Sequence, residues 1–210
     1  MEELPQLNKV EILLSKLEAY KLFTDQDKVN LILVLEGAKS ICEIELNNPS
    51  KEAYEKNADV VYQENTEEFE KSISVLEALI QELGLFYDKM AFHNNESQPE
   101  YDGVEFIVSK VQEKVDLFRK IEEEKNDEKR GIEFGKIFEI PDTAIKAFES
   151  GKLKLPEDLP SEIKQEEAFY FIYFAFSEDY WQEEFEIVRR RAEIVKEIAP
   201  NLYAKIVSGQ

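Results

Sequence analysis

The chain has 210 residues, of which 43% are hydrophobic and 34% charged, and it contains only 7 Gly and 7 Pro. This hydrophobic content is enough for a folded core, and the scarcity of turn-forming residues argues against β-sandwiches and β-barrels, which need turns at short intervals. The net charge of −20 argues against direct binding to nucleic acid or to an anionic membrane, because both depend on Lys and Arg side chains that neutralise phosphates.

Cysteine usage and hydropathy indicate the compartment. The single cysteine, Cys42, excludes an internal disulfide and any multi-cysteine metal site. The sequence opens without the pattern of a secretory signal, and no apolar run approaches the roughly 20 residues that a membrane-spanning helix needs. We therefore expect a cytoplasmic protein without a membrane partner.

The first fifty residues are predicted to form two helices. Apolar residues recur every three or four positions at Leu7, Val10, Leu14 and Leu17. This spacing predicts a helix over 6–22. Thr24 and Asp27 then offer a capping box, and the apolar residues after it, including Cys42, keep helical spacing as far as Leu46. We predict one long helix over 25–46, although a strand would also fit its apolar centre.

A heptad-like pattern marks the middle of the chain. Steps of four and three residues connect Phe69, Ile73, Leu76, Ile80, Leu83 and Tyr87. The same steps recur after a polar break, at Val104, Val108, Val111, Val115 and Phe118. Two such stripes predict an antiparallel helical hairpin whose seams face one another.

The charged run over 122–130 is the predicted boundary between an N-terminal helical part, 1–128, and a C-terminal part, 129–210, that packs on it; a single domain is the alternative. Short alternation after this run fits either a brief strand near 132–140 or an irregular turn. Pro141 and Gly151 bound a predicted short helix. A final helix should begin near Trp181 and break at Pro200. The expected fold class is all-α, a multi-helix bundle.

The segment 168–176 is apolar at every position, so we predict that it belongs to the core, either in a helix capped by Ser161 or in an aromatic-rich strand. The pattern changes after Ser177, where aromatic rings stand among acids. A half-exposed aromatic edge of this kind is typical of a ligand or partner site.

Arg189-Arg190-Arg191 stands out in so acidic a chain. Ion pairs along the helix, such as Glu186 with Arg190, are the preferred interpretation, and an anion clamp is the alternative.

No motif meets the demands of a catalytic, cofactor or metal site. The segment 131–136 has three residues between its glycines where a phosphate-binding loop has four, and no Ser or Thr follows its lysine. The Glu-x-x-His motif of di-iron bundles is missing. His93, the only histidine, is explained by the polarity of its segment. We expect no catalytic residue, no metal ligand and no cofactor.

The segment GIEFGKIFEIPDTAIKAF over 131–148, with FAFSEDYWQEEF and APNLYAKIV downstream, resembles an uncharacterised, mainly archaeal family. Its relatives carry a Gly-Tyr-Pro-x-Cys-Cys signature before a short helix, and a second cysteine-bearing segment. The matching positions here, 139–144, lack the cysteines. The resemblance therefore implies that any thiol-based metal or redox chemistry of those relatives is missing from this chain.

Two functions fit these observations. The first is a non-enzymatic protein-interaction or scaffold module that forms a homodimer through its helical stripes or offers acidic faces to a basic protein partner, with mimicry of nucleic acid as a variant. The second is an enzyme or small-ligand-binding protein with an aromatic-lined pocket. The candidate binding residues are Tyr170, Tyr173, Tyr180, Trp181 and His93.

Overall fold

The fold is that of a computed structural model, which describes residues 10, 14–17, 19–20, 22–49, 62–93 and 101–209, without the side chains of 47–49, 62–66, 92–93 and 101–102. The helices are α2 (Asp25–Leu35), α4 (Tyr62–Glu82), α5 (Gln112–Glu122), α6 (Asp127–Ile137), α7 (Asp142–Ser150), α8 (Ser161–Lys164), α9 (Trp181–Ile198) and α10 (Pro200–Ser208). Two 3₁₀ helices are η1 (Pro156–Asp158) and η2 (Glu167–Phe171). The strands are β1 (Ile41–Pro49), β2 (Phe86–His93), β3 (Tyr101–Ser109), β4 (Leu153–Lys154) and β5 (Phe176–Ser177).

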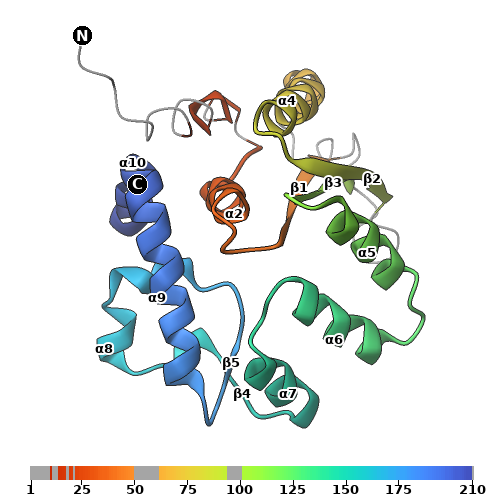
Figure 1. Ribbon diagram of the computed structural model, residues 1–210. Helices are drawn as coiled ribbons and strands as arrows, with labels where there is room; N and C mark the ends of the chain where they lie inside the picture. The colour runs from red at the N-terminus through yellow and green to blue at the C-terminus, as the bar shows by residue number, and fades with distance from the viewer. Residues whose placement is uncertain are drawn as a thin grey trace.

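The expectation of an all-α bundle is wrong, because the chain folds as a mixture of helices and two antiparallel sheets. One sheet has the order β1-β3-β2 and the other pairs β4 with β5. Helix α2 lies in the middle of the molecule, between the larger sheet and α9, and α4 and α5 flank that sheet (Figure 1). Buried residues all around α2 explain the nearly continuous apolar run there.

The predicted helix over 25–46 is two elements. Thr24 does cap α2, and the predicted capping box with Asp27 is present. The helix ends at Leu35, and Gly37, with a φ of 72°, turns the chain into β1. Cys42 and Leu46 lie four residues apart, which places them on one face of a strand as well as on one face of a helix. Their spacing alone fits both, but Ile44, midway between them, completes the alternation that is typical of a strand.

The predicted helical hairpin is also wrong. The first stripe is largely α4, which Gly84 ends with a φ of 70°, but Tyr87 lies on β2. The second stripe is divided between two elements: Val104 and Val108 lie on β3, and Val115 lies on α5. The hairpin that does form joins strands β2 and β3.

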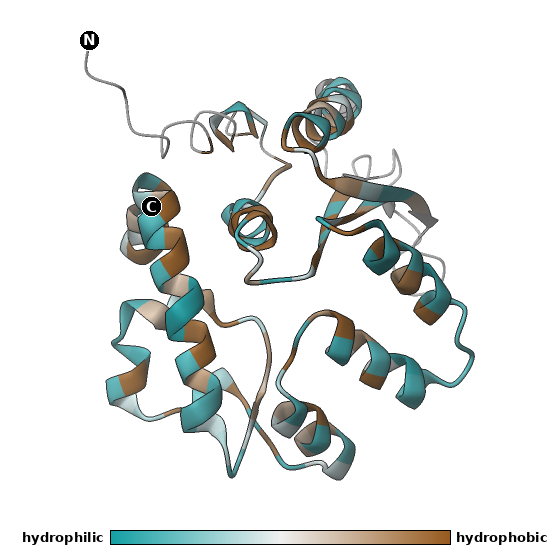
Figure 2. Ribbon diagram, in the orientation of Figure 1, coloured by the Kyte–Doolittle hydropathy of each residue, from teal (hydrophilic) through white to brown (hydrophobic). Residues whose placement is uncertain are grey.

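Each face of the larger sheet has its own core. Cys42, Ile44 and Leu46 of β1 point into the main core. A second core on the other face comprises Ile41, Ile107, Phe118, Ile121 and Ile137. It is built by β1, β3, α5 and α6, and apolar and polar bands alternate along α5 and α6 (Figure 2). Helix α6 therefore replaces the strand or turn predicted near 132–140, and its N-cap is Asn126.

Some of the predictions for the C-terminal part are confirmed and one is wrong. Helix α7 begins after Pro141 and ends at Gly151, as predicted, and Pro200 starts α10 after a break at Ala199. The apolar segment 168–176 is neither one helix nor one strand, because η2 and β5 divide it, although Phe171, Phe174 and Phe176 are buried as expected.

Three further expectations concern the chain as a whole. The boundary at residue 128 falls at the start of α6. The main core contains Val29 and Val188, from both predicted parts, and the division into two domains stays a prediction. The helix predicted over 6–22 lies mostly outside the described residues, of which 14–17 are helical. Within the described part of the chain, no helix combines the length and the apolar character needed to cross a membrane.

Candidate functional site: a polar cavity beside Lys39

A cavity of about 630 Å³ opens where α2, the start of β1, the turn after α6 and the segment after η2 meet. We call it the Lys39 cavity. Its lining residues are Thr24, Gln26, Asp27, Asn30, Lys39, Glu43, Glu45, Phe138, Ile140, Ile172 and Tyr173. Polar side chains thus come from α2 and its N-cap, from the loop after α2 and from β1, whereas the apolar ones come from the C-terminal half.

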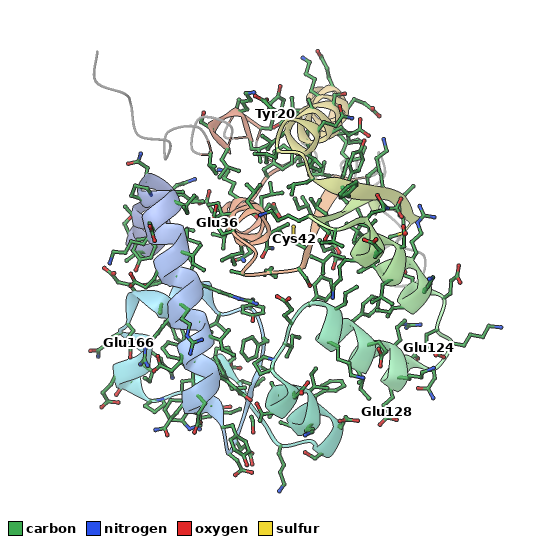
Figure 3. The ribbon with its side chains drawn as sticks, viewed as in Figure 1. Tyr20, Glu36, Cys42, Glu124, Glu128 and Glu166 are labelled. Atoms are coloured by element: carbon green, nitrogen blue, oxygen red, sulfur yellow. The ribbon has the colours of Figure 1, made fainter. Side chains whose placement is uncertain are left out.

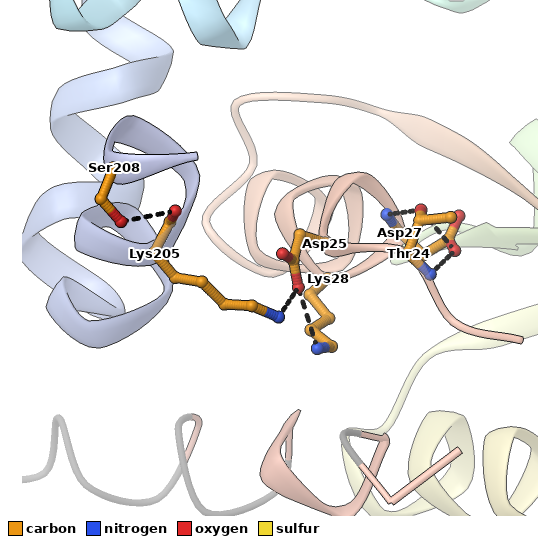
Figure 4. Close-up of polar contacts among 6 residues, drawn as sticks. All are labelled: Thr24, Asp25, Asp27, Lys28, Lys205 and Ser208. Carbon is orange, nitrogen blue, oxygen red and sulfur yellow. Dashed lines mark hydrogen bonds and ion pairs between the residues drawn. The ribbon is translucent and has the colours of Figure 1, made fainter. Parts of the chain in front are cut away.

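The α2 wall follows from the cap of that helix. Asp27 Oδ2 accepts hydrogen bonds from the backbone N and the hydroxyl of Thr24, both at 2.7 Å, and Thr24 Oγ1 accepts one from Asp27 N (Figure 4). Gln26 and Asn30 lie one turn apart on the same face, and Gln26 Nε2 donates to Asn30 Oδ1. Burial raises the pKa of Asp27. The hydrogen bonds of the cap therefore occupy the carboxylate of Asp27. Asn30, which lies further along the same helix, also lines the cavity.

Lys39 is the central residue of the cavity. It lies in the loop between α2 and β1, and only 6% of it is exposed. Its Nζ donates a hydrogen bond of 2.9 Å to Asn30 Oδ1 and lies 5.2 Å from the ring centroid of Tyr173. Among the described residues it forms no ion pair with a carboxylate. Burial and, to a smaller extent, the charge of Arg191 lower the pKa of Lys39 to about 8.

A second buried cation stands behind Tyr173. Arg191, on α9, is 4% exposed, and its Cζ lies 3.9 Å from the centre of the Tyr173 ring. Its Nη2 is 4.0 Å from Glu139 Oε2. The hydroxyl of Tyr173 and Nη1 of Arg191 are buried without a hydrogen-bond partner in the described part of the chain. Burial raises the pKa of Tyr173 to about 12 and lowers that of Arg191.

Glu139 is held by the loop that carries Lys39. Its Oε2 accepts a hydrogen bond of 3.1 Å from Ser40 N, while Ser40 Oγ donates to the carbonyl of Ile137. The backbone of Glu139 has a φ of 58°, a left-handed conformation that costs an L-residue about 1–2 kcal/mol. The docked turn therefore places the carboxylate of Glu139 where its charge acts on both Arg191 and Lys39.

The opposite wall is acidic. Glu43 and Glu45 lie two residues apart on β1, so their side chains point to the same side of the sheet. Glu45 lies opposite Glu105 of β3. Burial and the neighbouring carboxyl of Glu105 together raise the pKa of Glu43 to about 8. With this pKa, Glu43 is mostly protonated at pH 7 and can donate a hydrogen bond. The cavity has a cationic end at Lys39 and a proton-donating wall at Glu43.

Cys42 lies on the other face of β1, between the sheet and α2 in the middle of the molecule (Figure 3). It is fully buried, as expected, and burial raises the pKa of its thiol to about 12. A thiol in this state is not nucleophilic, because the thiolate is the reactive form. The cavity therefore offers an amine, and not a thiol, as its reactive group.

Two smaller cavities lie in the C-terminal half. One, of about 260 Å³ between α6 and α7, has an apolar lining and shares Phe138 and Ile140 with the Lys39 cavity. The other, of about 270 Å³, is lined by Tyr180, by Lys146 and by several hydroxyl groups. Neither is lined by a residue with an unpartnered buried polar atom among the described residues. The Lys39 cavity is thus the best candidate for a site.

The five predicted binding residues do not converge. Tyr173 lines the Lys39 cavity, whereas Tyr180 lines the smaller one. Tyr170 is 52% exposed, and the ring of Trp181 lies 5.9 Å from Lys154 Nζ. The side chain of His93, at the end of β2, lies outside the described residues.

Sequence reasoning missed Lys39 and Glu43, and it assigned the three arginines to ion pairs. Arg189 does pair with Glu166, at 2.6 Å. Arg191 instead points inward, and its position two residues after Arg189 on α9 is the signal that could have separated them.

No protein-family model, curated protein or solved structure matches the chain. The resemblance of the C-terminal part to the mainly archaeal family stays a prediction. Among the residues that the structure describes, no three side chains of His, Cys, Asp or Glu are grouped so that they could hold a metal ion.

Proposed function

We propose that this chain is a cytoplasmic binding protein for a small organic anion, such as a carboxylate or a phosphate ester, which it holds in the Lys39 cavity. One observation carries the proposal: a buried ammonium group lines a cavity and has no carboxylate partner among the described residues. A buried charge without an opposite charge beside it destabilises the free protein. An anion that binds next to the charge removes this destabilisation, which adds to the free energy of binding.

The surroundings of Lys39 support an anionic ligand. Charge-assisted hydrogen bonds from an ammonium to carboxylate or phosphate are stronger than neutral ones. The unpartnered hydroxyl of Tyr173 supplies a further donor, and Arg191 adds positive charge behind the ring. The volume of about 630 Å³ lies in the range of ordinary ligand pockets.

The acidic wall restricts the ligand further. Glu43, protonated at neutral pH, can donate to a ligand oxygen, and Glu45 can accept from a hydroxyl or amino group. The ligand class that fits both ends is therefore an organic anion with at least one additional polar group.

Calorimetric titration with succinate, 2-oxoglutarate and glycerol 3-phosphate tests the proposal, with glycerol and putrescine as neutral and cationic controls. We expect at least one anion to bind wild-type protein and to lose about tenfold or more in affinity with Lys39→Met. Lys28→Met is the matched control, because Lys28 is equally buried but pairs with Asp25 and does not line the cavity. Binding of putrescine alone, or equal affinity of the Lys39→Met variant, would contradict the proposal.

One of the predictions that supported the interaction or scaffold function is wrong. It relied on two facing helical stripes, and the second of these is divided between β3 and α5. What still supports a basic protein partner is the net charge of −20. That function, including the homodimer, stays a prediction.

A further inference from the structure

Resting on the proposed function, we propose that Lys39 captures carbonyl compounds: its amine forms an imine with an anionic aldehyde or ketone of the 2-oxo acid type inside the Lys39 cavity. The proposal narrows the ligand from organic anions in general to those with a carbonyl carbon next to the anionic group. It also adds a chemical step that simple binding does not require.

The position of the amine supports this step. Lys39 Nζ lies 2.9 Å from Asn30 Oδ1 and 5.2 Å from the ring centroid of Tyr173, and all three residues line the cavity. An incoming ligand therefore meets the amine from the cavity side. Lys39 has no ion pair with a carboxylate among the described residues, so no such contact holds its amine in the protonated state.

The amine is also in the environment that makes a lysine nucleophilic. Lysines that attack carbonyl groups are desolvated or lie beside another cation, because both conditions favour the neutral amine. Lys39 meets both conditions, through its own burial and through Arg191. With a pKa of about 8, about a tenth of the amine is neutral at pH 7, against roughly one part in a few thousand for an ordinary lysine.

The chemistry balances without a further reactant. The neutral nitrogen attacks the carbonyl carbon, a C–N bond forms, and a proton moves from nitrogen to oxygen to give a carbinolamine. The hydroxyl then accepts a proton and leaves as water, while nitrogen gives up its remaining proton and the C=N bond forms. The carboxyl of Glu43, which lines the same cavity and is protonated at neutral pH, can lend the proton that the departing hydroxyl needs and recover it afterwards.

Reductive trapping tests the capture. Wild-type protein is incubated at pH 7 with pyruvate or 2-oxoglutarate and sodium cyanoborohydride, and the adducts are located by peptide mass spectrometry. Lactate, which has the size and charge of pyruvate without its carbonyl, is the matched control ligand. We expect one dominant adduct at Lys39, formed at least ten times faster than at any other lysine.

Three variants extend the test. Lys39→Arg should abolish this adduct, and Lys28→Arg, at a buried lysine outside the cavity, should keep it. Arg191→Met removes the neighbouring charge, so it should shift the pH of half-maximal trapping upward and slow the reaction several-fold at pH 7. The midpoint of unfolding of each variant shows whether that variant is folded. The location of the adduct in the wild-type protein tests the proposal even if a variant does not fold.

The outcomes separate this proposal from the proposed function. Trapping spread evenly over surface lysines, or no adduct while anions still bind in a Lys39-dependent way, would overturn the capture and leave anion binding intact. If neither binding nor an adduct is observed with any of the anions, both proposals fail.

Discussion

The guanidinium carbon of Arg191 lies 3.9 Å from the centre of the Tyr173 ring, yet the Tyr173 hydroxyl and Arg191 Nη1 lack hydrogen-bond partners among the described residues. A cation over an aromatic ring is favourable, by about 0.5–2 kcal/mol. A buried hydroxyl without a partner costs about 1–3 kcal/mol. The pair thus combines a stabilising contact with hydrogen-bonding capacity that the described residues leave unused.

Removal of the Tyr173 hydroxyl should separate stability from binding. Tyr173→Phe keeps the ring contact with Arg191 and deletes an unpaired polar atom, so we expect urea denaturation to show unchanged stability or a gain of up to about 1 kcal/mol. Affinity for the anion should fall about tenfold in calorimetry. Tyr170→Phe, at an exposed ring, should alter neither quantity. A clear loss of stability in Tyr173→Phe would mean that the hydroxyl already has a partner.

Glu43 should make stability depend on pH between about 4.5 and 8. Its pKa is raised to about 8 in the folded chain, so in this window the folded state keeps a proton that the unfolded state has lost. Stability therefore falls as pH rises through the window. Glu43→Gln should remove this fall, by on the order of 1–2 kcal/mol because solvent screens part of the shift.

Urea denaturation at pH 5 and pH 8 measures this difference. Glu113→Gln, which changes an exposed acid on α5, is the control and should follow the wild-type pH dependence. If Glu43→Gln and wild type lose the same stability between the two pH values, Glu43 does not hold a proton in the folded state.

Glu184 should contribute strongly to the stability of the C-terminal half. It is 2% exposed, its Oε2 accepts a hydrogen bond of 2.7 Å from Ser177 N, and its Oε1 accepts one from the hydroxyl of Thr143. The carboxylate thus joins α7, β5 and α9. Glu184→Ala leaves the Ser177 amide unpaired, and we expect a loss of about 2–4 kcal/mol by chemical denaturation. Glu183→Ala, at the exposed neighbouring position, should stay within about 0.5 kcal/mol of wild type.

The two glycines of α6 should respond differently to alanine. A Cβ at Gly131 would find its nearest neighbour, Phe148 Cε1, at 4.0 Å, so Gly131→Ala should stabilise the helix by up to about 1 kcal/mol. A Cβ at Gly135 would lie 3.0 Å from Ile145 Cγ1 on α7. Gly135→Ala should therefore be less stable than Gly131→Ala by about 1 kcal/mol or more. Equal melting temperatures would show that α7 moves freely to accept the methyl group.

Long apolar stripes and clear end signals made several helices predictable from the sequence. Helix α4 has a long stripe, α7 has Pro141 and Gly151 at its ends, and Pro200 separates α9 from α10. The helices predicted at β1 and β3 relied on residues four apart, a spacing that returns to the same face in both a helix and a strand. The strand signal is the alternation of apolar residues two apart, at Cys42, Ile44 and Leu46 and again at Val104, Phe106 and Val108.

The site was less predictable than the fold. Tyr173 was identified because it lies in a conspicuous aromatic segment. Lys39 carries no local signal, since its burial depends on Tyr173 and Arg191, which are distant in sequence. A cation that is buried by such tertiary contacts can be identified only in the folded structure.

The most direct test of a binding site at Lys39 is a titration of its side chain by NMR. Protein labelled with ¹³C at the ε-carbon of lysine gives one signal per lysine, and Lys39→Arg identifies the signal of Lys39. We predict that this signal titrates near pH 8 in the free protein and at a higher pH in the presence of a bound anion, which favours the charged amine. A Lys39 that titrates with the surface lysines and responds to no anion would contradict the account.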